Sequence, residues 1–275
     1  MVDLLAKLGV GTALFVLILL FGRRPESIFQ RAAGMLLTFP ALNGIALAMT
    51  ETSHTAVKAA AMFPLMPFNG LMFFGYMLNI DRIESLWKRP HPTALMLAAV
   101  LVWIAVALPG FAIPPDLQLP YMVACAAIAL WLTIGSLPDK PTAAADQTRY
   151  LQKWDLVRVP SFMLLLLVLL LLGQSGDYAL WTGQLSAFPI PGFFGLAVIA
   201  SGDNARAALR QMRTTVLLGP LVAMTFVYLT WPLVDQRGWT VELIVLLIPG
   251  WAACLAVILA ISWVLGRIEK VARGA

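Results

Sequence analysis

Thr38-Phe39-Pro40-Ala41-Leu42-Asn43-Gly44 interrupts one long hydrophobic segment, and Ala187-Phe188-Pro189-Ile190-Pro191-Gly192-Phe193-Phe194-Gly195 interrupts another, about 150 residues later. Proline and glycine break helices, so backbone groups at each interruption lack their usual intrahelical partners. In hydrocarbon, each unpaired group costs several kcal/mol unless protein, water or a ligand satisfies it. Matching interruptions in the two halves of a membrane protein indicate a transport site.

The composition is that of a protein that crosses the membrane several times. Of the 275 residues, 60% are hydrophobic and 12% are charged, whereas a soluble domain carries about 25% charged residues. A helix needs about 20 apolar residues to cross a bilayer. By this measure nine segments qualify as spans, at 4–21, 31–50, 57–79, 93–113, 119–137, 158–173, 179–200, 214–232 and 241–265.

The basic residues orient these spans. If the N-terminus is outside, 16 of the 19 Lys and Arg residues lie on the cytoplasmic side, and only Lys7, Lys58 and Arg237 lie outside. This distribution follows the positive-inside rule and predicts a cytoplasmic C-terminus, in a bacterial inner membrane. The net charge of +5 then indicates loops beside anionic lipids, so no nucleic-acid partner is needed to explain it.

A polar stretch at 137–155 divides the chain into two related parts. Residues 1–136 form a first transmembrane repeat plus a connecting span, 137–155 a cytoplasmic linker, and 156–275 a second, inverted repeat. Five spans separate equivalent elements, so these elements cross the membrane in opposite directions. The sequence therefore predicts an all-α fold of about nine transmembrane helices, in two inverted-topology repeats (4+1+4) with a broken second helix in each.

The candidate substrate-binding residues lie at the two interruptions and in the third span of each repeat. Half-helix ends expose N–H donors or carbonyl acceptors there, and asparagine amides add further hydrogen-bonding groups. The set comprises Phe39, Pro40, Asn43, Gly44, Asn69, Gly70, Phe188, Pro189, Pro191, Gly192, Gly195, Gly219 and Pro220. A structural alternative stays open: prolines and glycines kink packed helices, Asn43 satisfies the broken backbone, and Asn69 makes an interhelical hydrogen bond.

Polar residues also follow each broken span. Glu51 and His54 follow the first at the predicted outer face, and Asp203 and Asn204 follow the second at the predicted inner face. These four are candidates for gating the pathway or for binding an ion. The competing interpretation is that they are the solvated ends of spans.

Enzyme chemistry has little support in the sequence. Gly173-Gln174-Ser175-Gly176 matches the G-x-S-G of rhomboid proteases, which need a histidine on a later helix, but His54 and His91 both come earlier. No phosphate-binding, zinc-protease or dithiol motif occurs, and Cys125 and Cys254 form no disulfide framework or metal motif. We expect no catalytic residue, no metal and no cofactor.

This organisation resembles that of inverted-repeat secondary transporters with crossing broken helices, and the resemblance implies alternating access around a site near the midplane. We expect an inner-membrane transporter of a small organic, amphipathic or lipid-linked solute, with the bilayer as its other partner. Homo-oligomerisation is left open. Two alternatives are a non-transporting assembly or lipid-binding factor, and an enzyme acting on a lipid head group with Glu51 or Asp203 as its acid or base.

Overall fold

The described part of the chain is helical. The computed structural model describes residues 15–22, 24, 27–38, 62–78, 101, 113–135, 187, 189, 192, 195–196, 199, 205–237 and 241–272, and no strand occurs among them. The helices are α2 (Ser27–Leu37), η1 (Phe63–Leu65), α5 (Met66–Leu78), η2 (Pro115–Leu117), α8 (Gln118–Gly135), α12 (Ala205–Arg213), α13 (Gly219–Arg237) and α14 (Val241–Ala272), and residues 15–22 are helical as well. The all-helical class is confirmed for these residues, while the nine spans and the inverted repeats stay predictions.

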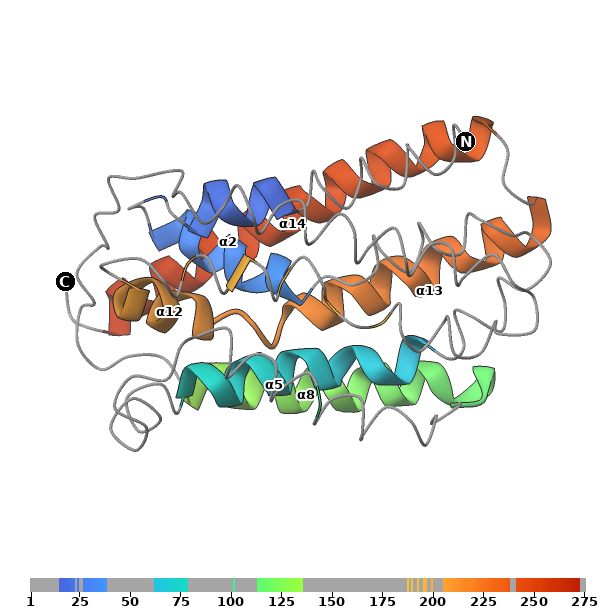
Figure 1. Cartoon of the computed structure of the whole chain (residues 1–275). Coiled ribbons are helices and arrows are strands. Elements are labelled where there is room, and N and C mark those ends of the chain that lie inside the picture. Colours follow the sequence, from blue (N-terminus) through green and yellow to red (C-terminus); the bar gives the residue numbers. More distant parts are fainter. Residues whose placement is uncertain are drawn as a thin grey trace.

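Helix α13 lies at the centre of the described helices (Figure 1). It packs against α14 on one side and against α5 and α8 on the other, and its first turn meets α2. Helix α12 packs against α2 and α5. The end of α2, where the predicted interruption begins, therefore lies next to the start of α13.

Helix α13 runs in the opposite direction to α14 and to α5. At Gly250, in the first half of α14, a Cβ would lie 3.2 Å from the Phe226 ring of α13. Near the other end of α14, Gly266 lies beside Arg31, whose carbonyl accepts a hydrogen bond from Thr215, just before α13 begins. Helices α13 and α14 are thus antiparallel, and α5 is antiparallel to α13 as well (Figure 1). The crossing order derived from the sequence requires the same relative directions.

A proline sets the start of α5. Pro67 has no N–H to offer the Phe63 carbonyl, and the N–H of Met66 binds that carbonyl instead, so the helix begins with the 3₁₀ turn η1. The carbonyl of Pro64 accepts a hydrogen bond of 2.8 Å from the Tyr121 hydroxyl. This bond ties the start of α5 to the start of α8.

The described helices differ from the predicted spans in several places. Helix α13 begins at Gly219 rather than at 214, since residues 214–218 form turns and Pro220 suits a first helical turn. Helix α14 continues to Ala272, past the predicted end at 265. Helix α12 fills a stretch between two predicted spans, with Leu209 and Met212 buried and Arg210 exposed.

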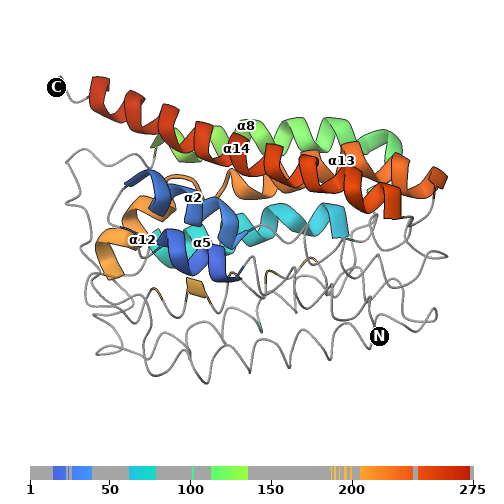
Figure 2. The ribbon, with the colours of Figure 1, turned by 90° about the horizontal axis from the view of Figure 1, so that it is seen from above.

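Two described helices are long and apolar enough to cross a membrane, namely α8 and the Ala252–Glu269 part of α14. A core helix of a soluble protein passes the same test, but it is mostly buried. Here only 11% of the first segment and 17% of the second are buried, and both helices lie along one edge of the molecule (Figure 2). Their exposed apolar faces indicate association with a membrane.

Candidate functional site

Helix α2 ends at the position where the sequence predicts the first interruption. Helix α2 ends at Leu37, and Thr38 forms a turn in which its N–H binds the Met35 carbonyl at 3.2 Å. Phe39-Pro40 follows directly, and a residue before proline is biased away from helical geometry. Four candidates of this segment, Phe39, Pro40, Asn43 and Gly44, lie outside the described residues.

Asn69 of α5 binds the backbone of the second interruption. Pro191 has no N–H, so the carbonyl of Ala187, four residues earlier, has no helical donor available to it. The Asn69 side-chain amide is fully buried and donates a hydrogen bond of 2.7 Å to this carbonyl. An apolar side chain at position 69 would leave the buried carbonyl without this donor.

Thr38 does the same for the backbone before α13. Pro220 offers no N–H to the Val216 carbonyl, again four residues earlier. The Thr38 hydroxyl lies 3.1 Å from this carbonyl and 3.0 Å from the Met35 carbonyl. Because the Met35 carbonyl already accepts the Thr38 N–H, the hydroxyl proton is available to Val216.

These two bonds share one pattern. Each acceptor is a carbonyl that a proline deprives of its helical donor, and it belongs to the predicted second repeat. Each donor is a buried polar side chain of the predicted first repeat, Thr38 or Asn69. These two carbonyls are therefore satisfied across the predicted boundary between the repeats, as an apolar environment requires.

Glycines allow the end of α2 to approach both the second interruption and the start of α13 closely. A Cβ on Gly192 would lie 1.9 Å from the Leu37 carbonyl oxygen, and one on Gly219 would lie 2.0 Å from the Thr38 hydroxyl. A Cβ on Gly70 would lie 3.0 Å from the Pro220 ring. At the first two positions no larger residue fits without moving the backbone or the Thr38 side chain.

All the described members of the candidate set are buried, namely Asn69, Gly70, Pro189, Gly192, Gly195, Gly219 and Pro220. Of the remaining candidates, Phe188 and Pro191, like Glu51, His54, Asp203 and Asn204, lie outside the described residues. Asn69 and the glycines make the contacts that the structural alternative predicts, namely an interhelical hydrogen bond and close packing. Solute binding by this set stays a prediction.

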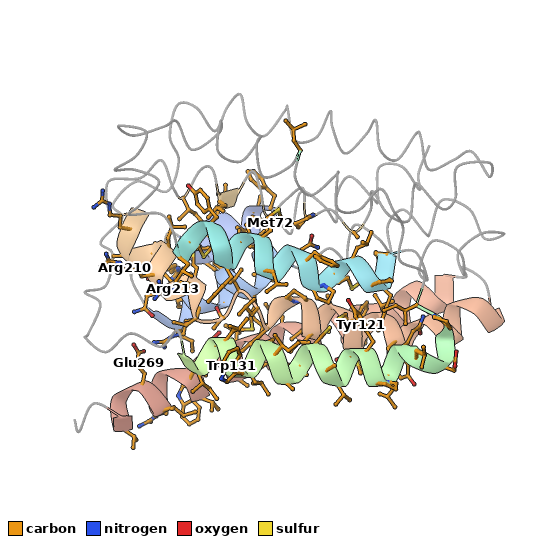
Figure 3. The ribbon with its side chains drawn as sticks, turned by 90° about the horizontal axis from the view of Figure 1, so that it is seen from below. Met72, Tyr121, Trp131, Arg210, Arg213 and Glu269 are labelled. Carbon is orange, nitrogen blue, oxygen red and sulfur yellow. The ribbon has the colours of Figure 1, made fainter. Side chains whose placement is uncertain are left out.

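Two features of the structure, the Thr38 hydroxyl bond and a buried ion pair, were not predicted from the sequence. Thr38 is the first residue of the first interruption, but it was not among the predicted substrate-binding residues, although a hydroxyl beside a helix break can readily donate a hydrogen bond. The ion pair of Arg31 with Glu269 was also missed, since no local pattern pairs residues 238 positions apart. Glu269 lies at the same end of the molecule as Arg210 and Arg213, far from Tyr121 (Figure 3).

Among the described residues, no group of three or more His, Cys, Asp or Glu side chains could hold a metal ion. Comparison of the chain with protein-family models, with curated proteins and with solved structures finds no match.

Proposed function

We propose that this chain is an inner-membrane secondary transporter that moves a small organic or amphipathic solute by alternating access. The solute would bind where the two interrupted segments cross, between the end of α2 and the 187–195 segment. Two inverted repeats would rearrange around this site. No nucleotide or metal is required.

One observation carries the proposal: Thr38 and Asn69 each donate to a carbonyl that a proline has deprived of its helical partner, in the opposite repeat. A static bundle can be built from unbroken helices, which satisfy their own backbone. These two carbonyls depend on donors from the other predicted repeat, and they supply hydrogen-bonding groups a solute can compete for. Polar groups inside an apolar bundle are functional candidates by default.

The close packing of Gly192 and Gly219 favours a second candidate, a membrane assembly factor that transports nothing. In that case the glycines serve helix packing and the two donors only fix the fold. An enzyme acting on lipid head groups would use Glu51 or Asp203, and both lie outside the described residues.

The first test compares Thr38→Val, which keeps the shape but loses the hydroxyl, with Thr38→Ser, which keeps the hydroxyl. Proteoliposomes are mixed with a defined set of small organic solutes, and protein-dependent uptake is measured by mass spectrometry. Losing one functional hydrogen bond is worth about tenfold, so we expect at least about that loss of uptake in Thr38→Val and wild-type uptake in Thr38→Ser. If the folded protein transports none of the solutes, or if Thr38→Val transports normally, the proposed site is wrong. The hypothesis of a membrane assembly factor is then favoured.

A further inference from the structure

A buried ion pair joins the first repeat to the end of the last helix. Arg31 of α2 donates to the carboxylate of Glu269 in α14, and the two side chains are 3% and 6% exposed. Burying two charges costs much of what their attraction returns, so an ion pair is a poor choice for a permanent internal contact.

The surroundings fit the pair closely. Gly266 makes room for the guanidinium, because a Cβ there would lie 2.7 Å from Nη1 of Arg31. The backbone carbonyl of Arg31 accepts a hydrogen bond of 2.6 Å from Thr215, in the turn that leads into α13. Arg31 is thus linked to α14 by its side chain and to the start of α13 by its backbone.

The pair lies at one end of the candidate site. Arg31 lies on α2, seven residues before Thr38, the residue that follows the helix; seven residues correspond to about 10 Å along a helix. Helix α2 therefore connects the pair directly to the interruption. A separation of Arg31 from Glu269 would free the side of α2 that leads to the crossing.

The pair has no charged counterpart in the other repeat. The shift of 149 residues that matches Phe39-Pro40 with Phe188-Pro189, and Gly70 with Gly219, places Leu180 opposite Arg31. In inverted-repeat transporters the two repeats exchange conformations between the two states. An interaction available to only one repeat therefore stabilises only one state.

We propose that the Arg31–Glu269 pair is a gate that holds this end of the transport pathway closed, an inference that rests on the proposed function. On opening, each charge regains its hydration, so the pair separates readily. An apolar pair in its place would expose apolar surface to water on opening and would therefore stay shut. A permanent structural contact would show no such difference.

The test measures access to the closed end in the full-length protein, with Cys125→Ala and Cys254→Ala and the reporter Thr214→Cys. Thr214 is fully buried and lies next to Thr215. The rate of reaction with N-ethylmaleimide in membranes is measured for Glu269→Gln, for the double variant Arg31→Met with Glu269→Leu, and for the control Arg267→Gln, whose parent side chain is exposed and lies over Trp263.

A shift of the open population by one pair of charges predicts a rate about tenfold higher in Glu269→Gln, at least about threefold lower in the apolar double variant, and unchanged in Arg267→Gln. If the double variant reacts as fast as its parent, or faster, the pair is a fixed contact and the gate is wrong. This variant decides the question alone if Glu269→Gln does not accumulate in folded form. The assay needs no solute, so its failure refutes the gate only, whereas absence of uptake in the Thr38 experiment refutes transport.

Discussion

Two regions of the molecule are both apolar in sequence, yet they differ in what they bury. One is the crossing, where the end of α2 meets Gly192 and the start of α13, and the other is helix α8. At the crossing, small and polar residues are buried: Thr38, Asn69 and Gly219 lie against backbone of other segments. On α8, large apolar side chains are exposed, with Trp131 at 74% and Ile134 at 65%. Hydropathy alone does not separate these two regions.

The difference shows where each region finds its partners. The crossing is held by backbone contacts and hydrogen bonds, which suit a place where backbones approach closely. Helix α8 offers side chains that only lipid or another protein can cover. The three predictions below test this contrast, beginning with the largest effect.

Gly219→Leu should be the most damaging change, because even its Cβ would lie 2.0 Å from the Thr38 hydroxyl and 2.2 Å from the Met35 carbonyl. We expect a loss of about 5 kcal/mol, enough to prevent accumulation of folded protein. The control is Gly135→Leu at the end of α8, where a Cβ would meet nothing within 4 Å. Thermal unfolding in detergent measures both; equal midpoints for the two variants would contradict the packing at the crossing.

The sequence predicted α8 well because hydropathy is what defines it. Its predicted limits of 119–137 differ from Gln118–Gly135 by two residues or fewer, and prolines at 115 and 138 lie close to its ends. Helix α8 is mostly exposed, so its limits depend on local composition more than on contacts with distant segments. An apolar run of the right length was therefore sufficient.

The second prediction tests whether lipid covers α8. Ile128→Lys, near the middle of the helix, should lower membrane insertion by about 3 kcal/mol, and Ile134→Lys, near its end, by less than about 1 kcal/mol, since a terminal lysine reaches the interface. Both parent side chains are more than half exposed. The amount of protein that detergent extracts from membranes measures the effect. Equal tolerance at both positions would show that water surrounds α8.

The crossing was harder to predict, for two physical reasons. The prolines at 40, 189, 191 and 220 showed where carbonyls or N–H groups would lack helical partners, so the candidate region followed from sequence. Which side chain satisfies which carbonyl depends on tertiary packing, and Thr38 was missed for that reason. Helix α12 was missed because its arginines hide it from a hydropathy search, while its buried face depends on α2.

The ion pair shows the same limit. Arg31 was counted only among the charges that orient the chain, and Glu269 lies in a basic stretch near the C-terminus. A carboxylate there gives no sign of its partner, because the two helices meet only in the folded protein. Gly266 would have been the sole local signal of a close approach.

The last prediction compares a buried polar side chain, Asn69 of α5, with an exposed one, Thr225 of the neighbouring helix α13. Asn69→Leu removes the donor to the Ala187 carbonyl, and leaving a buried carbonyl unpaired costs about 1–3 kcal/mol. Thr225→Val removes a hydroxyl on an exposed face, which lies 2.8 Å from the Leu221 carbonyl of its own helix and 3.8 Å from the Met122 sulfur of α8. We expect its effect to stay within about 0.5 kcal/mol, as for other surface substitutions. Unfolding midpoints of both variants in detergent check the contrast. If Asn69→Leu is as stable as Thr225→Val, the hydrogen bond from Asn69 to the Ala187 carbonyl does not stabilise the second interruption. The buried polar groups at the crossing then have no special role.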